Sequence, residues 1–273
     1  MPELPEVETT LRGIEPHLLE QKISKVVVRE TRLRWPVSEA FQTLKNAHVS
    51  NLHRRAKYII MQVTAPRHGH IIIHLGMSGS LRVVDQHTPL KKHDHIDFIL
   101  TRGKALRYHD PRRFGAVLWT DEAIEQHILL KSLGPEPLSN HFHGEHLFNA
   151  SRKRKMAVKN FIMDAHVVVG VGNIYASEAL FAAGIRPGKA AGRISKAGYE
   201  ALAAAIKTVL ARSIAQGGTT LRDFVNSDGQ PGYFQQTLNV YGRQGEPCRQ
   251  CSGVIKAKTI GQRSTFYCSN CQS

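Results

Sequence analysis

The first residues of the chain place a secondary amine beside a carboxylate. Pro2 follows Met1, and a methionine before proline is normally removed in cells, which would leave the amine of Pro2 free. An α-amino group has a pKa near ~8, so part of it is unprotonated and nucleophilic at neutral pH. Such an amine can attack an electrophilic carbon and form a Schiff base, which for a secondary amine is a permanently charged iminium. Glu3 is adjacent, and Glu6 and Glu8 follow within about one helical turn. The alternative is an ordinary chain start whose glutamates stabilise the N-terminus of a helix.

A second group of reactive side chains lies near the other end of the sequence. The four cysteines form two Cys-x2-Cys pairs, Cys248 with Cys251 and Cys268 with Cys271. Two such pairs can supply four thiolates to one tetrahedral ion, which predicts a zinc ribbon with one structural Zn2+. Disulfide bonds are the alternative, and they would need an oxidising compartment that no other feature of the sequence indicates.

The composition limits the partners. Lysine and arginine number 37 against 22 acidic residues, a formal net charge of +15, which indicates a polyanion and favours nucleic acid over membrane. At 273 residues, two domains and a small module are expected. No apolar run is long enough to predict a transmembrane helix, and the acidic, proline-bearing start does not resemble a signal peptide. The protein is therefore expected to remain in the cytoplasm.

The secondary structure expected to position these groups changes along the chain, from a short helix to β-strands in the first half. Residues 5–12 suit a short helix, which Gly13 and Pro16 are expected to weaken or kink. Short apolar or alternating runs then predict an antiparallel β-sandwich between residues 22 and 120. Examples of these runs are residues 23–29, 58–63, 70–75, 81–84, 96–100 and 117–119.

The second half of the chain has helical composition. Residues 131–139 are rich in Gly and Pro and predict a linker. Helices are expected at residues 152–164, 173–183 and 196–216, with a tight glycine turn leading into a cap near Asn173. Residues 217–236 predict a long binding loop or lid.

These features together resemble the formamidopyrimidine-DNA glycosylase family over nearly the whole chain. The matching motifs are PELPEVE at the start, HLGMSG at 74–79, DPRRFG at 110–115, GVGNIYASE at 170–178, SDGQPGYF at 227–234 and the cysteine pairs. The resemblance implies an α+β multidomain fold. Its parts are an N-terminal antiparallel β-sandwich with a leading helix (2–130), the linker (131–139), a helix–two-turn–helix domain (140–236) with a lesion-capping loop (217–236), and a zinc-ribbon finger (237–273).

The resemblance also implies a function. Such proteins are bifunctional base-excision repair enzymes that remove oxidised purines, 8-oxoguanine and formamidopyrimidines, from double-stranded DNA. A Schiff base to the terminal proline then supports β,δ-elimination at the abasic site. A bacterial, nucleoid-associated monomer is expected. The rival family is endonuclease VIII, which prefers oxidised pyrimidines, and a rival of another class is a non-catalytic zinc-ribbon DNA-binding protein.

The family motifs assign roles near the start of the chain. Pro2 is expected to be the nucleophile and Glu3 the acid/base, a role that contributes about 10²–10⁴-fold. Glu6 is expected to orient the N-terminus and Glu8 to serve the helix alone. Lys57 matches a family lysine near the lesion, and its alternative is one more surface lysine in the basic run 54–57.

Base flipping leaves a gap in the duplex that an apolar side chain can fill. Met77 and Phe114 lie in turns and are the expected wedge, and Arg112 is expected to contact the partner base. Their alternative is packing beneath their own loops. Expected DNA contacts also come from Asn173 at a helix start, from Arg263 between the cysteine pairs, and from Lys155 and His93. The histidines at 68, 70, 74, 87, 93 and 95 match no metal-ligand spacing.

Overall fold

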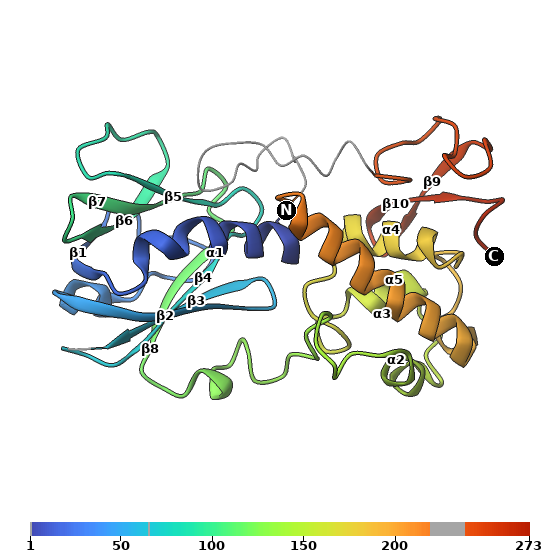
Figure 1. Ribbon diagram of the computed structural model, residues 1–273, viewed down its shortest axis with the longest axis horizontal. Coiled ribbons are helices and arrows are strands. Elements are labelled where there is room, and N and C mark those ends of the chain that lie inside the picture. Colours follow the sequence, from blue (N-terminus) through green and yellow to red (C-terminus); the bar gives the residue numbers. More distant parts are fainter. Residues whose placement is uncertain (1, 65, 219–237) are drawn as a thin grey trace. The chain divides into compact units, whose positions relative to one another are not determined.

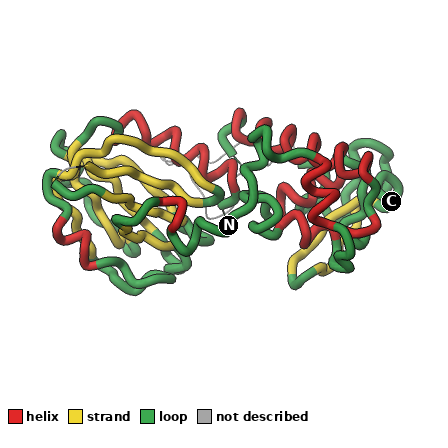
Figure 2. Tube along the Cα trace, turned by 90° about the horizontal axis from the view of Figure 1, so that it is seen from below, coloured by secondary structure: helices red, strands yellow, loops and turns green. Residues whose placement is uncertain are grey.

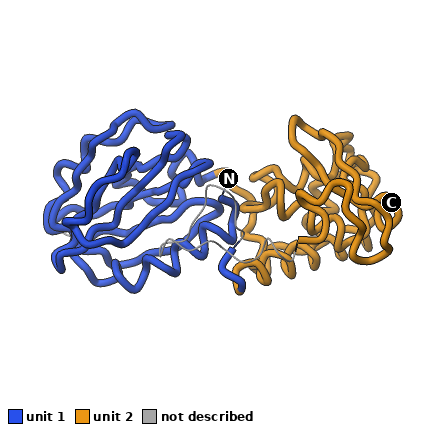
Figure 3. The backbone as a smooth tube through the Cα atoms, turned by 90° about the horizontal axis from the view of Figure 1, so that it is seen from above, with its two compact units in different colours: residues 1–131, 216–233 blue, residues 132–215, 234–273 orange. Residues whose placement is uncertain are grey.

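The chain forms two compact units (Figure 3). A computed structural model describes residues 2–64, 66–218 and 238–273. Unit 1 contains the described residues up to 131 together with 216–218, and unit 2 contains residues 132–215 and 238–273. Most of the expected lid, residues 219–236, lies outside the described residues. Within the described part of the chain, none of the helices has the length and apolarity to cross a membrane.

Unit 1 begins with helix α1 (Leu4–Leu18). The expectation that this helix ends near Arg12 is wrong, because it continues through both Gly13 and Pro16. Its buried apolar residues recur every three or four positions, at Val7, Leu11, Ile14 and Leu18. Burial of this face against strands β2, β3 and β5 outweighs the local weakening by proline (Figure 1).

An antiparallel sheet of eight strands makes up the rest of unit 1, in the order β5-β7-β6-β1-β2-β3-β4-β8. Strands β1 and β2 pair at Lys22–His48 and Ile23–Ala47, and this short junction joins two four-stranded halves. The strands are β1 (Lys22–Val28), β2 (Ala47–Arg55), β3 (Tyr58–Thr64), β4 (Gly69–His74), β5 (Ser80–Asp85), β6 (Asp94–Leu100), β7 (Lys104–His109) and β8 (Ala116–Thr120). Two short 3-10 helices, η1 (Glu39–Thr43) and η2 (Ile124–Gln126), lie in the connections.

The hydrophobic core of unit 1 draws on both halves of the sheet. Met61 and Ile73 from one half and Phe98 and Leu106 from the other belong to one buried cluster, which also includes the apolar face of α1. The β-sandwich with a leading helix is therefore confirmed. Strands β2 and β7 are not among the example runs named from the sequence, and polar residues interrupt the apolar pattern of both strands.

Unit 2 is helical and ends in a two-stranded hairpin, as the colouring of Figure 2 shows. Helix α5 packs against α2 and α4, and α4 packs against α3 and β10. The elements are α2 (Gly144–Ser151), α3 (Val158–Met163), α4 (Asn173–Ala182), η3 (Ala191–Arg193), α5 (Lys196–Ala215), β9 (Ile255–Ile260) and β10 (Arg263–Cys268).

The single helix expected at residues 152–164 is wrong at its start. Helix α2 ends at Ser151, and α3 begins only at Val158. The guanidinium of Arg152 donates to the carbonyl oxygens of Gly192 and Ile194, both at 3.0 Å, and Lys153 has a φ of 64°. These tertiary contacts hold the segment in a turn that the helix-compatible composition did not reveal.

Candidate functional site

The N-terminus of α1 is buried and held by a reciprocal capping arrangement. Pro2, Glu3 and Glu6 are all buried. The backbone N–H of Glu3 donates to Oε2 of Glu6 at 2.8 Å, and the two residues form a capping box. A Cβ on Gly218 would lie 3.4 Å from Oε1 of Glu6, so the beginning of the expected lid is next to this carboxylate. Glu6 therefore has the contacts of a residue that fixes the start of the helix.

Glu8 links α1 to the turn that carries Lys57. One oxygen of Glu8 accepts a hydrogen bond from Arg12 and the other from Arg54, both at 2.9 Å. A second nitrogen of Arg54 donates to the carbonyl oxygen of Ala56 at 2.9 Å. Ala56 has a positive φ of 55° and directly precedes Lys57 between β2 and β3. Glu8 thus connects two elements of the site, beyond the helix-only role expected from the sequence.

Met77 and Phe114 project from two neighbouring turns of unit 1. Their exposed fractions are 36% and 46%, so neither side chain is packed beneath its own loop. Arg112 is also exposed, and its guanidinium carbon lies 5.0 Å from the centre of the Phe114 ring, a cation–π arrangement. The structure therefore brings together Met77, Arg112 and Phe114 in the part of unit 1 where their two turns meet.

Asp110 connects these two turns through hydrogen bonds to residues of both. It is fully buried and accepts hydrogen bonds from the hydroxyl groups of Ser78 at 2.8 Å and Tyr108 at 3.1 Å. It also accepts from the backbone N–H of Gly115 at 2.9 Å, and the N–H of Arg112 donates to Ser78 at 3.3 Å. Burial, together with the neighbouring Asp110, raises the pKa of Tyr108 well above its usual value. The sequence offered a signal for Asp110, an acid before proline at the start of a turn, but its role was missed.

Glycine is required where the two turns touch. Gly76 has a φ of 64°, and a Cβ there would collide with the backbone of Phe114 and Gly115. A Cβ on Gly115 would collide with the hydroxyl of Tyr108. The close approach of the backbones fixes the Met77 turn against the Phe114 turn.

His74 supports the Met77 turn as a neutral acceptor. Its Nδ1 accepts a hydrogen bond from the N–H of Gly76 at 3.0 Å, and its ring lies 5.0 Å from that of Tyr58. Burial lowers the pKa of His74 to about 4, with additional lowering by the charges of Lys57 and Arg34. The ring is therefore uncharged at neutral pH, and its Nδ1 atom stays free of a proton and can accept the hydrogen bond from Gly76. Lys57 directly precedes Tyr58, which pairs with His74, so the backbone of that lysine lies close to this turn.

The two arginines of the second turn have different partners. Arg113 has a φ of 56° and donates to Oε2 of Glu30 at 2.9 Å, whereas Arg112 lies over Phe114. Hydrogen bonds from Arg32 hold the pKa of Glu30 at about 2, so this carboxylate remains charged.

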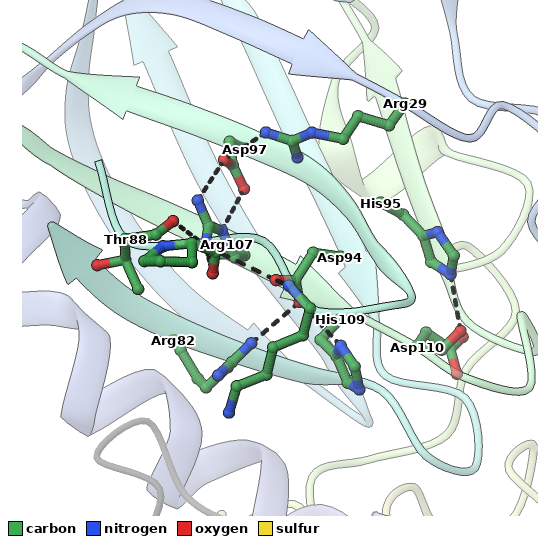
Figure 4. A network of polar contacts seen from close by, with 11 residues as sticks. Arg29, Arg82, Thr88, Asp94, His95, Asp97, Arg107, His109 and Asp110 are labelled. Atoms are coloured by element: carbon green, nitrogen blue, oxygen red, sulfur yellow. Dashed lines mark hydrogen bonds and ion pairs between the residues drawn. The ribbon is translucent and has the colours of Figure 1, made fainter. Parts of the chain in front are cut away.

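His93 lies immediately before β6 with a left-handed φ of 75°, uncommon for a residue other than glycine. Its carbonyl oxygen accepts the N–H of Asp110 at 3.1 Å. The preceding loop is held by Arg107, a buried arginine that makes two hydrogen bonds of 2.9 Å to Asp97 and one of 3.1 Å to the carbonyl of Thr88 (Figure 4). Sequence reasoning missed this network, because a buried arginine in an apolar strand has no spacing signature.

Unit 2 holds a separate group of candidate residues around the start of α4. The ammonium of Lys159, a fully buried residue, donates to Oδ1 of Asn173 at 2.5 Å, to the carbonyl of Ser264 at 3.1 Å and to the hydroxyl of Thr265 at 2.7 Å. The amide of Asn173 also donates to the Ser264 carbonyl at 3.0 Å. Arg263 is exposed and begins β10 next to Ser264. Lys159, which sequence reasoning missed, therefore connects Asn173 with Ser264, the residue next to Arg263.

Lys155 stands apart from this group. It is exposed in the turn between α2 and α3, and the structure gives it no hydrogen bond or ion pair to any residue that it describes. Its expected DNA contact remains a prediction.

The four cysteines come together as expected for a zinc site. Their sulfur atoms all lie within 4.8 Å of one another, with Cys248 to Cys271 at 3.9 Å and Cys251 to Cys268 at 3.5 Å. Tetrahedral zinc with bonds of about 2.3 Å separates its sulfur ligands by about 3.8 Å. A disulfide would need about 2.05 Å, so the disulfide alternative does not fit. Among the described residues this is the one cluster with metal-ligand geometry, and it fits one structural zinc.

Comparison with known proteins defines the class. Family models match three consecutive parts of the chain. The N-terminal domain of formamidopyrimidine-DNA glycosylase covers residues 1–117, its H2TH domain covers 133–225, and a zinc finger found in FPG and IleRS covers 245–273. The chain is 62% identical over 272 residues to formamidopyrimidine-DNA glycosylase of Alcanivorax borkumensis and 58% identical over 272 residues to that of Escherichia coli O6:H1, with 100% of each chain covered.

Solved structures agree with the family models. The MutM (Fpg) protein from Thermus thermophilus has a TM-score of 0.89 at 33% identity and covers 99% of this chain and 98% of its own. A Lactococcus lactis FPG mutant, in complex with Fapy-dG-containing DNA, has a TM-score of 0.92 at 30% identity with 100% of both chains covered. A two-unit chain with a β-sandwich, helices and a zinc finger is the architecture of this class of DNA-repair proteins. The chain belongs to the formamidopyrimidine-DNA glycosylase family.

Proposed function

We propose that this protein is a base-excision DNA glycosylase with AP lyase activity that removes 8-oxoguanine and formamidopyrimidines from duplex DNA. The observation that carries the proposal is the Pro2–Glu3 pair, fixed by Glu6 in the unit that also presents Met77, Arg112 and Phe114. Membership of the family supports the activity. The complexes of the Lactococcus lactis protein with DNA containing Fapy-dG or an abasic site support the substrate class.

The chemistry follows from an amine next to a carboxyl group. Once Met1 is removed, the nitrogen of Pro2 attacks C1′ of the damaged nucleotide, and the glycosidic bond breaks as the base leaves with the electron pair. Glu3 donates a proton to the sugar oxygen as the ring opens, which gives the iminium. Loss of a proton from C2′ then expels the 3′ phosphate, and a second elimination expels the 5′ phosphate. Lys57, at the β2–β3 turn, is the proposed lesion-side cation for these steps.

The exposed turns supply the means to reach a base inside a duplex. Flipping costs a few kcal/mol of stacking, which an inserted side chain can offset. Met77 and Phe114 are the proposed wedge, and Arg112, held over the Phe114 ring, is the proposed contact to the partner base. His93 is the proposed phosphate contact of the same unit.

Unit 2 is proposed to grip the DNA backbone. Asn173 begins a helix, where backbone N–H groups favour an anion, and Arg263 lies on the hairpin that the zinc ribbon holds. Lys155 is a further proposed DNA contact, at the position of a family lysine linked to handling of the damaged base. The net charge of +15 and the bacterial origin of the relatives support a place of action at the nucleoid.

Borohydride trapping tests the activity, and a substrate comparison tests the specificity. A duplex with 8-oxoguanine should give a covalent protein–DNA adduct and be cleaved faster than a duplex with thymine glycol. Faster cleavage of thymine glycol would support the endonuclease VIII-like alternative. Binding without trapping or cleavage on either duplex would support a non-catalytic DNA-binding protein.

A further inference from the structure

His109 lies at the base of the two turns that carry the proposed wedge. As the last residue of β7, it is paired with Ser80 on β5 and with Asp94 on β6. Ser80 follows the Met77 turn, and Asp110 begins the turn of Arg112 and Phe114. His109 takes no part in the proposed reaction, yet it lies between both turns and next to His93.

A buried carboxylate fixes the orientation of the His109 ring. The Nδ1 atom of His109 lies 2.8 Å from Oδ1 of Asp94, whose side chain is fully buried (Figure 4). Because a carboxylate can only accept, Nδ1 carries the proton and donates it to Asp94. The same oxygen accepts from Arg82 at 3.0 Å, and the other accepts the N–H of Lys91 at 2.8 Å. Asp94 is therefore anchored from three sides.

The second ring nitrogen of His109 remains available for a ligand. The side chain is 22% exposed, and its Nε2 has no hydrogen-bond partner among the residues that the structure describes. The ring centre lies 6.2 Å from that of His93, with an interplanar angle of 76°. The third histidine of the group differs, because Nε2 of His95 already contacts the carbonyl oxygen of Asp110 at 2.8 Å. His93 and His109 are therefore the two histidines of this group that can contact a ligand.

We propose that His109 is a second phosphate-binding histidine beside His93, held by Asp94, and that it takes up a proton when DNA binds. The proposal rests on the proposed function, since it names a DNA contact of the same unit. In the neutral ring Nε2 carries a lone pair, which would repel a phosphate oxygen. In the imidazolium, Nε2–H donates to the phosphate while Asp94 stabilises the positive charge.

The proton uptake is proposed to depend on the charge that DNA brings. Arg82 from β5 and Arg107 from β7 pair with Asp94, and the His93 ring lies edge-on to that of His109. The other charged or titratable residues of the adjoining segments are Lys91 and Lys92 in the loop before β6, His95 on β6, and Asp110 and Arg113 in the turn after β7. A DNA phosphate at Nε2 adds a negative charge that stabilises the imidazolium. Because the complex then binds more protons than the free protein, affinity rises as the pH falls, by at most about tenfold per pH unit for one proton.

The experiment compares three proteins in binding to a duplex with a tetrahydrofuran abasic analogue, by fluorescence anisotropy from pH 6 to 8. In H109N the shorter amide can still donate to Asp94, but Nε2 and the titratable charge are lost. H87Q is the matched control, because His87 is exposed and its ring contacts Gln86 alone among the described residues. The wild-type protein and H87Q should gain the same affinity as the pH falls. H109N should gain about three- to tenfold less.

A salt titration at pH 6 separates a phosphate contact from a structural role. Loss of one phosphate contact should lower the slope of log affinity against log salt by about 0.9 in H109N, whereas a folding defect would lower the melting temperature without changing this slope. An H109N protein with the full pH gain and the full salt slope would overturn the proposal. Borohydride trapping separates a failure of the His109 proposal from a failure of the proposed function. If the wild-type protein is trapped but H109N keeps the wild-type pH and salt slopes, only the role of His109 is rejected. If the wild-type protein is not trapped, the proposed function is rejected.

Discussion

Substitution of Asp110 by Asn should uncouple the two wedge turns. The carboxylate accepts three hydrogen bonds, from Ser78, Tyr108 and Gly115, and it is fully buried. In D110N one oxygen becomes an NH2 group that faces donors, so at least one bond to a charged acceptor is lost and a buried donor is left unpaired. Loss of such a bond costs about 1.5–3 kcal/mol, and an unpaired buried donor costs about 1–3 kcal/mol. Because the two costs overlap in part, the unfolding free energy is expected to fall by about 2–4 kcal/mol.

Thermal unfolding and single-turnover kinetics measure the two consequences of D110N. The melting temperature should fall by roughly 5–15 °C. Excision of 8-oxoguanine should slow by about tenfold or more, because the wedge is no longer held in place, while cleavage of a pre-formed abasic site should slow less. S78A, which removes one of the three donors, should lie between D110N and wild type.

The matched control for D110N is D121N. Asp121 is mostly exposed and forms a 2.8 Å ion pair with Arg67, and solvent screens such a surface pair so that it adds little to stability. D121N should therefore melt and excise close to wild type. A D110N protein that matches D121N in both melting temperature and excision rate would refute this role of Asp110.

Three further predictions concern other parts of the structure. M77A should impair excision more than cleavage of a pre-formed abasic site, in a gel assay with both duplexes; equal losses would count against the wedge. C268S should lose the single zinc, measured by metal analysis, and DNA affinity with it, and retention of either would contradict the ribbon's role. His74 has a pKa of about 4 in the folded state against 6.5 normally, so the unfolded chain binds more protons between these values. The unfolding free energy should therefore fall by up to about 3 kcal/mol as the pH drops from 6.5 to 4. H74N, whose amide can still accept from Gly76, should show a flatter dependence in urea titrations, and an unchanged slope would exclude His74 as the cause.

Local patterns in the sequence were sufficient for features that depend on neighbours in the chain. The cysteine spacing predicted the zinc site, and the alternating runs predicted the sandwich. For Met77 and Phe114 the turns allowed projection from the surface, and the family resemblance favoured it over packing beneath their loops. In each case the chemistry is contained within a few consecutive residues.

Features that depend on burial by distant residues could not be predicted. Helix α1 passes Pro16 because Leu18 is buried in the sandwich core, which no local propensity reports. Asp110 and Lys159 act through partners from other elements, and their sequence context resembles that of any turn acid or surface lysine. The expected helix start at Arg152 is wrong for the same reason, since the turn at Arg152 depends on carbonyl groups some forty residues away.

The proposed chemistry depends above all on the amine of Pro2 forming the covalent bond to DNA. Borohydride trapping on an 8-oxoguanine duplex, followed by proteolysis and mass spectrometry of the adduct, tests this bond most directly. The DNA remnant is expected on the N-terminal peptide at Pro2, and an added N-terminal extension is expected to abolish trapping. An undiminished adduct from the extended protein, or a remnant on a lysine such as Lys57, would contradict the role of Pro2.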